Sequence, residues 1–405
     1  MKTDPGKVRS VGLIALAQVA ALVLWFSITA VAPDLAAQHH LSSGWLAVLA
    51  LAVQLGFVTG GLVSSGVGLA DRMDPRRLFA LGAVAGAAAN ILFLLLDPGG
   101  WGAVVSRFVV GAALALVYPV GMKMAAGWAT KGDAGLLVGI LVGALTLGSA
   151  APHGFAWAGG VDWRSGVMAA SACAVVAAVL IQFVKLGPRH APAARFDPRA
   201  VLDIVRDRGV RLATLGYLGH MWELYAGWTW IGALMAASFA GCMAKPEAAH
   251  AGKLAAFAVV AIGAAGCVAA GWLADRVGRT TVTMAAMAVS ALACLGFAAA
   301  FGAPPVWILL VGLVWGVAVI ADSAQFSASI AELAQPGRVG TLLTVQTALG
   351  FALTAFSIRL LPVWTEAVGW RWAFAPLAIG PALGVLAMAR LRAAPEASRL
   401  AGGKR

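Results

Sequence analysis

Charged residues are scarce in this chain. They make up 11% of its 405 residues, whereas soluble domains carry about 25%, and the mean hydropathy of +0.88 is correspondingly high. The four cysteines are scattered, with no pair at the CxxC spacing that many metal and redox sites use. This composition excludes an ordinary water-soluble fold and gives no support to a disulfide framework or a metal centre.

Motifs of several enzyme classes are missing as well. The sequence contains no GxxxxGK[ST] phosphate-binding loop, no HExxH metalloprotease motif and no GxSxG nucleophile elbow. The first absence argues against an ATP-driven pump, and the others argue against the matching hydrolases. We therefore expect a protein that is not an enzyme and that needs no cofactor and no metal.

Long apolar runs, by contrast, follow one another along the whole chain. A bilayer span needs roughly 20 mainly apolar residues, and only helices or closed barrels satisfy the backbone in lipid. The runs are too long for barrel strands. They predict an all-α membrane protein with twelve transmembrane helices, at about residues 11–33, 44–69, 78–96, 101–128, 135–157, 164–185, 211–240, 252–274, 280–302, 305–331, 339–361 and 370–390.

The net charge of +12 is unevenly distributed. If the N-terminus is cytoplasmic, 22 of the 29 Lys and Arg residues fall on the cytoplasmic side, which is the asymmetry of the positive-inside rule. We expect a multi-pass protein of a bacterial inner membrane with both termini in the cytoplasm. The excess charge would orient the chain and contact membrane lipids, rather than nucleic acid.

The longest polar interruption separates two sets of six predicted helices. It occupies residues 186–210, between an N-terminal bundle at 1–185 and a C-terminal bundle at 211–405. Each half carries a similar loop between its second and third helices, GLADRMDPRR with Asp71 in the first and GWLADRVGRT with Asp275 in the second. Such internal similarity indicates two related six-helix halves.

The loop pattern G-x-L-A-D-R-x-G-R-R/K, repeated in a twelve-helix chain, resembles the signature loop of the major facilitator superfamily of secondary transporters. The second copy fits the pattern up to its last position, which is Thr280. The first copy has Val67 for the leading glycine and Asp74-Pro75 for the inner one, so we expect a differently shaped turn. The stretch RFVVG, which begins at Arg107, is similar to the family's arginine motif in the fourth helix.

The resemblance implies that the two loops act as a conformational latch of the outward-open state. A short loop with Asp and Arg at fixed positions can pair with neighbouring helix ends in one conformation and release them in another, and an aspartate is favoured at a helix N-terminus. The alternative is a basic turn that serves topology alone. The latch residues expected on this basis are Asp71, Arg72, Asp275, Arg276 and Arg279.

Five charged residues lie inside the predicted spans. A charge at the centre of a span costs about 2.5–3.5 kcal/mol on insertion scales, so such residues are expected to face a cavity, a partner or a pathway. The resemblance implies a central site lined by the first, fourth, seventh and tenth helices, and four of the five charges fall on the last three of these. The five are Arg107, Lys123, Glu223, Asp322 and Arg359.

The seventh predicted helix carries the residues that we expect to couple transport to protons. His220 and Glu223 share one helical face, with Tyr217 and Trp230 nearby as substrate-binding candidates. Burial favours the neutral form of a carboxyl group, which suits a proton carrier. Glu223 is the first candidate for that role, with His220 and Arg107 assisting, and the alternative is that Glu223 forms a structural salt bridge.

The remaining candidates lie on other cavity helices. Asp322 is either a second coupling carboxylate or a partner of Lys123 across the cavity, and Lys123 could instead reach the cytoplasmic interface. Gln325 shares a face with Asp322. With Lys123 and Gln325, we expect Tyr118 and Gln18 to contact substrate.

These features predict a monomeric, proton-coupled secondary transporter that works by alternating access. The in-span charges comprise three bases and two acids, and a bound anion would offset the surplus, so we favour symport of a small organic or inorganic anion with protons. Proton-driven efflux of lipophilic or cationic compounds is one alternative. Carriage of a transition metal or metal chelate is another, suggested by His39-His40, Cys242-Met243 and His250. A receptor or assembly factor without transport activity is the last.

Overall fold

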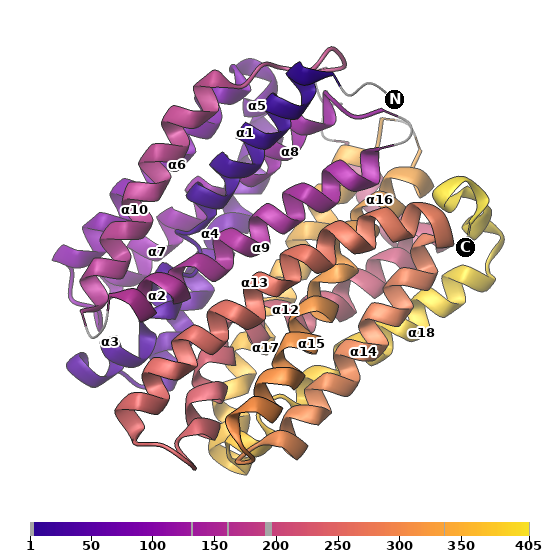
Figure 1. The fold of residues 1–405 in the computed structure, drawn as a ribbon. Helices are drawn as coiled ribbons and strands as arrows, with labels where there is room; N and C mark the ends of the chain where they lie inside the picture. Colours follow the sequence, from indigo (N-terminus) through magenta and orange to yellow (C-terminus); the bar gives the residue numbers. More distant parts are fainter. Residues whose placement is uncertain (1–3, 131–132, 160–161, 191–196, 336, 405) are drawn as a thin grey trace. The chain divides into compact units, whose positions relative to one another are not determined.

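The computed structural model of the chain describes residues 4–130, 133–159, 162–190, 197–335 and 337–404. Its ordered elements within these ranges are all helical. The chain forms two compact units, Met1–Ala193 and Ala194–Arg405, which Figure 1 draws in indigo to magenta and in pink to yellow. The boundary between them lies inside the segment 186–210 that we expected as a linker.

The first unit contains six spanning segments with short helices between them. Its elements are α1 (Pro5–Leu22), α2 (Ser27–Ala30), α3 (Ala32–His39), α4 (Ser43–Val67), α5 (Leu69–Arg72), α6 (Pro75–Leu92), η1 (Phe93–Leu95), α7 (Trp101–Leu114), α8 (Tyr118–Ala126), α9 (Ala134–Ala158), α10 (Trp163–Leu180) and η2 (Ile181–Phe183).

The second unit repeats this plan. Its elements are η3 (Pro198–Leu202), α11 (Asp203–Arg206), α12 (Arg208–Phe239), α13 (Lys245–Val277), α14 (Arg279–Ala300), α15 (Pro305–Ala321), α16 (Ser323–Leu333), α17 (Val339–Val368), η4 (Trp370–Trp372), η5 (Ala375–Ala378), α18 (Ile379–Ala393) and η6 (Pro395–Gly403).

Among the described residues, ten helical stretches are long and apolar enough to cross a membrane. The other two predicted spans are the first of each half, formed by α1 with α2 and by α12. These two are the more polar ones: α1 begins with basic residues, and α12 carries two arginines, His220 and Glu223. The expected all-α fold with twelve spans in two six-helix halves is confirmed.

Several helices begin where the sequence supplies an N-cap. Asp4, Ser42, Asp162 and Asp207 each accept a hydrogen bond from a backbone N–H of the first turn of α1, α4, α10 and α12. The first four N–H groups of a helix have no partner within it, and Ser or Asp at the N-cap satisfies one of them. The polar punctuation of an otherwise apolar sequence therefore sets these boundaries.

The helix packing is repeated between the two units. In the first unit α1 contacts α9 and α10, α6 contacts α7 and α10, and α4 contacts α7. In the second unit α12 contacts α17 and α18, α14 contacts α15 and α18, and α13 contacts α15. These five pairs occupy matching positions in the two halves, as a structural duplication requires.

Glycines bring two helices into backbone contact at matching places in both units. A Cβ atom added to Gly111 on α7 would lie 2.0 Å from the carbonyl oxygen of Val53 on α4. One added to Gly316 on α15 would lie 1.9 Å from the carbonyl oxygen of Val259 on α13. Small residues permit such close approach between helices in membranes, where van der Waals packing drives association.

Three spanning segments are interrupted near their polar residues. The first is non-helical at 23–26, the fourth at 115–117 and the tenth at Asp322. Pro119 lies in the first turn of α8, where a missing N–H does no harm. A broken helix leaves carbonyl groups without helical partners. The buried polar side chains described next contact the breaks at 23–26 and at Asp322.

Candidate functional site

Arg107 is the centre of a buried polar network in the first unit. It lies on α7 and is 1% exposed. Its guanidinium donates hydrogen bonds to the carbonyl oxygens of Leu24 at 3.0 Å and Trp25 at 3.2 Å, and to Asn90 Oδ1 at 2.7 Å. Leu24 and Trp25 lie in the break between α1 and α2. Arg107 therefore satisfies carbonyl groups that the broken helix leaves open.

Asn90 extends this network to a fourth helix. On α6, its Nδ2 donates to Ser171 Oγ at 2.9 Å and to the carbonyl oxygen of Val167 at 3.1 Å, both on α10. The membrane-spanning helices of the first unit contain no Asp or Glu. The buried charge of Arg107 is thus compensated by dipoles alone in the described residues, a costly arrangement for a cation. Asn90 was not among the residues predicted from the sequence, although it is an isolated amide in an apolar run.

Glu223 is the centre of a buried polar network in the second unit. It lies on α12 and is 1% exposed. Its Oε1 atom accepts hydrogen bonds from Ser290 Oγ at 2.6 Å, Cys294 Sγ at 3.0 Å and Trp315 Nε1 at 2.6 Å. The donors come from α14 and α15, the helices that correspond to α6 and α7. Cys294 stands 204 positions after Asn90, the same separation as between the two loop aspartates.

The two carboxylate oxygens of Glu223 have different surroundings. Oε1 receives three donors, whereas no hydrogen bond to Oε2 is formed within the described residues. No basic side chain there pairs with Glu223 either, so the salt-bridge alternative finds no partner in these ranges. A proton could bind Oε2 without displacing any of the three hydrogen bonds.

His220 and Asp322 form a second buried contact in the same unit. His220 Nδ1 lies 2.8 Å from Asp322 Oδ1, and both side chains are almost fully buried. Asp322 stands at the break between α15 and α16. We expected Asp322 to be a second coupling carboxylate or a partner of Lys123, and the structure adds a contact with His220. The contact is an ion pair when the imidazole is protonated.

The expected substrate-binding residues divide into two groups. Tyr217 packs beside His220 and Phe326, with ring centroids 6.2 and 6.0 Å away, and Trp230 Nε1 donates to the carbonyl oxygen of Ile358 at 3.2 Å. In the first unit, Gln18 Nε2 donates to the carbonyl oxygen of Tyr118 at 3.0 Å, while Gln18 Oε1 is buried without a hydrogen-bond partner in the described residues. These four residues remain on spanning helices.

Lys123 and Gln325 instead contact the signature loops. Lys123 forms an ion pair with Asp71 and donates to the carbonyl oxygen of Ala70 at 2.9 Å. Gln325 Oε1 accepts a hydrogen bond from Arg279 at 2.9 Å. Lys123 therefore contacts the first signature loop. A pair between Lys123 and Asp322 would join the two units, and it stays a prediction.

The first signature loop turns differently from the second, as its sequence predicts. Asp74 accepts a hydrogen bond from the backbone N–H of Arg76 at 2.9 Å and caps α6. The side-chain hydrogen bond from Arg76 is the main cause that lowers the pKa of Asp74 from 3.8 to about 2. In the second loop Gly278 takes φ +100°, a conformation that favours glycine. Arg72, an expected latch residue, is exposed.

Arg279 is the most connected residue of the second loop. Its guanidinium makes a bidentate contact with Glu332 on α16, with N–O distances of 2.8 and 2.6 Å, and lies 3.6 Å from Asp275 Oδ1. Arg276 stacks on Trp272, with its guanidinium carbon 3.6 Å from the ring centroid. Sequence analysis did not identify Glu332, because a single acid near a helix end carries no motif.

The C-terminal segment η6 also contacts this loop. The backbone N–H of Ala401 donates to Glu332 Oε2 at 2.9 Å, and Lys404 Nζ donates to the carbonyl oxygen of Asp275 at 2.8 Å. Leu400 is completely buried. The chain end therefore contacts both Glu332 and Asp275, the two acids that lie beside Arg279.

A metal centre finds no support in the described ranges, where no group of three or more His, Cys, Asp or Glu side chains is arranged to hold an ion. His39, Cys242 and His250, which suggested metal transport, lie in α3, in the turn after α12 and in α13.

Comparisons with known proteins agree with this architecture. The family model for the Major Facilitator Superfamily matches residues 14–321. The xylose transporter XylE from E. coli, in a partially occluded inward-open conformation, superposes with a TM-score of 0.75 at 15% identity, over 96% of this chain and 98% of that one. A D-xylose-proton symporter gives 0.71 at 17% identity, over 97% and 98%. A mutant of the nucleoside transporter NupG gives 0.70 at 13% identity, over 95% and 99%. No curated protein sequence matches. At these identities the structural likeness establishes the fold alone.

Proposed function

This chain belongs to the major facilitator superfamily, and from that premise we propose that it is a proton-coupled secondary transporter of a small solute, working by alternating access. Symport with protons is the direction of coupling that we favour. Two of the similar structures are a xylose transporter and a D-xylose-proton symporter, which supports coupling to protons in this fold.

The environment of Glu223 carries the proposal. Its carboxylate is buried in a span, receives three hydrogen bonds on one oxygen and none on the other, and pairs with no cation among the described residues. The three donors stabilise the ionised form, while burial favours the neutral form. Because hydrogen bonding and burial act in opposite directions on this carboxylate, a conformational change that alters either one can make it bind or release a proton. Binding and releasing a proton in this way is the task of a coupling acid.

The contact of His220 with Asp322 supplies a second site for a proton beside the first. The pair joins α12 to the break between α15 and α16. A change in the charge of the pair therefore acts where the tenth span is interrupted. We propose Glu223 as the carrier, with His220, Asp322 and Arg107 as residues that support coupling.

The distribution of charge favours an anionic solute. The spanning helices of the first unit contain basic residues and no acids, and Arg107 is buried there without a carboxylate partner in its network. A buried cation gains stability when an anion approaches. We propose a small organic or inorganic anion as the solute. The candidates for contacting it are Gln18 and Tyr118 in the first unit and, taken separately, Tyr217 and Trp230 in the second. Lys123 and Gln325 remain candidates from the sequence.

We propose a monomer in a bacterial inner membrane. The basic loops support the orientation with both termini cytoplasmic and contact with anionic lipid. Efflux of cationic or lipophilic compounds is the competing proposal, favoured by the acids of the second unit, Glu223 and Asp322.

One screen followed by one flux measurement tests the function. Thermal shift of the purified protein identifies a solute from a panel of organic anions, phosphate, sulfate, amines, divalent metals, xylose and uridine. The protein is then reconstituted with a pH-sensitive dye inside proteoliposomes. We expect an anion to stabilise the protein and its addition to carry protons inward. An amine hit that moves protons outward would replace symport with efflux, and solute uptake without proton movement would contradict coupling.

A further inference from the structure

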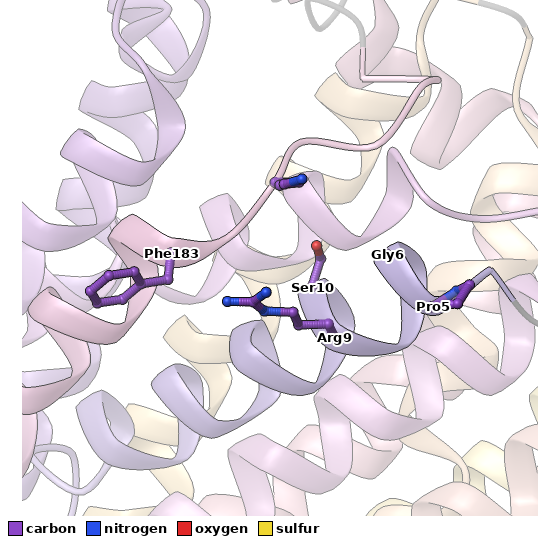
Figure 2. Close-up of a pocket in the computed structure, with 6 residues that line it drawn as sticks. Pro5, Gly6, Arg9, Ser10 and Phe183 are labelled. Carbon is purple, nitrogen blue, oxygen red and sulfur yellow. The ribbon is translucent and has the colours of Figure 1, made fainter.

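A small pocket lies between the start of α1 and the end of α10, apart from the buried networks. It has a volume of about 240 Å³. Pro5, Gly6, Arg9 and Ser10 line it from α1, and Phe183 and Lys185 line it from the segment that follows α10. All six residues belong to the first unit, and Figure 2 labels five of them, Pro5, Gly6, Arg9, Ser10 and Phe183.

Two positive charges at this pocket have no acidic partner. Arg9 and Lys185 are exposed, and neither side chain forms an ion pair within the described residues. Their basic neighbours do: Lys7 pairs with Asp133, and Arg76 pairs with Asp74. The acid nearest in sequence, Asp4, accepts a hydrogen bond from the backbone N–H of Gly6 as the cap of α1. The side chains that line the pocket therefore carry a net positive charge, which attracts anions.

Ser10 provides a donor inside the pocket. It is 2% exposed, and its hydroxyl forms no hydrogen bond within the described residues, although most serines on spanning helices of this chain do. In Figure 2 the hydroxyl is directed toward the segment after α10. A serine hydroxyl can donate one hydrogen bond, and a ligand oxygen in the pocket would accept it.

Apolar side chains beside the pocket identify its setting. Phe183 is 61% exposed and is the last residue of the apolar stretch Trp163–Phe183. Val8, next to Arg9, is 59% exposed. Exposed apolar groups directly beside cations are typical of the boundary between hydrocarbon and headgroups, where Lys and Arg reach toward phosphates.

We propose that this pocket binds the phosphate group of an anionic phospholipid. Arg9 and Lys185 pair with the phosphate, Ser10 donates a hydrogen bond to it, and Val8 and Phe183 lie against the acyl chains. Soluble phosphate offers the same oxygens but gains nothing from these two apolar side chains, so the lipid is the ligand that the whole pocket fits.

Native mass spectrometry of the purified full-length protein, titrated with phosphatidylglycerol, tests the proposal. Each basic residue near a membrane surface contributes about 1 kcal/mol to binding anionic lipid, so the double variant Arg9→Gln/Lys185→Gln should bind about thirtyfold more weakly. Ser10→Ala changes no charge and should weaken binding about fivefold, the equivalent of one neutral hydrogen bond. The control is Arg206→Gln/Arg390→Gln, which removes two exposed bases from the second unit, outside the pocket lining, and should bind like wild type.

Two further titrations separate the possible sources of phosphate. Phosphatidylcholine, which has no net charge, should bind weakly to every form, and millimolar inorganic phosphate should not displace phosphatidylglycerol. Equal binding by wild type and the pocket variants, or an equal loss in the control, would overturn the site. Inorganic phosphate that binds with the same dependence on Arg9, Ser10 and Lys185, while phosphatidylglycerol does not, would overturn the lipid as its ligand. None of these readouts depends on transport.

Discussion

Replacing Glu332 by Gln should loosen the second signature loop. Arg279 contacts Glu332 with two short hydrogen bonds, and the two side chains are 8% and 28% exposed. Hydrogen bonds to charged groups contribute about 1.5–3 kcal/mol each when buried, and partial exposure reduces this value. We expect Glu332→Gln to destabilise the closed loop by about 2 kcal/mol, which is about thirtyfold in its opening equilibrium.

Hydrogen exchange measured by mass spectrometry reads this change directly. Amides of residues 271–282 should exchange about thirtyfold faster in Glu332→Gln, while peptides from the first unit stay unchanged. Glu247→Gln, the same substitution at an exposed acid in the first turn of α13, is the control. Unaltered exchange in the loop would show that the Arg279–Glu332 contact does not hold it. Faster exchange throughout the protein would show general unfolding instead.

Three further results are expected. Acid should weaken the cap of α6, because the pKa of Asp74 is lowered to about 2. The stabilisation that ionised Asp74 provides is complete above the ordinary pKa of 3.8 and is lost as the pH falls toward 2. The melting temperature of Asp74→Asn should therefore fall less than that of wild type over this range. Deleting residues 395–405 removes the contacts of Ala401 and Lys404 and should lower the melting temperature; an unchanged temperature would mean that η6 contributes nothing. Single cysteines at Val205 and Pro304, in a background without the native cysteines, should label from opposite sides of the membrane, and labelling from one side would refute the topology.

The helices and the duplication could be predicted from the sequence because both depend on local patterns. The length of each apolar run determines whether it spans a bilayer, and the repeated loop fixes the correspondence between halves. The unusual first loop was also predictable, because Asp74-Pro75 is itself a capping sequence for α6. The same patterns located Glu223, since an acid in an apolar helix stands out in any window.

The partners of the buried charges could not be predicted in the same way. Glu223 binds Ser290, Cys294 and Trp315, which are ordinary residues of membrane helices, and only the rotation of three packed helices brings them together. Helical periodicity placed His220 and Glu223 on one face, and the structure directs them to different partners. A face about 100° wide can contact two neighbouring helices.

The breaks in the spans were equally hidden. Nothing in the composition of 23–26 or of Asp322 marks an interruption of the helix, because these residues are apolar or singly polar and contain no proline. Arg107 and His220 meet these breaks from other helices. Long-range contacts of this kind, rather than local propensity, determine where such a helix ends.

Gradient-driven accumulation by Glu223→Gln in proteoliposomes tests the central claim most directly. Wild type coupled to one proton should concentrate solute about tenfold for each unit of pH gradient, since one unit is worth about 1.36 kcal/mol. Glutamine mimics the protonated acid, so Glu223→Gln should still exchange solute between the two sides but should reach only equal concentrations, while the Glu247→Gln control accumulates like wild type. Tenfold accumulation by Glu223→Gln would contradict the account, because the coupling proton would then bind elsewhere.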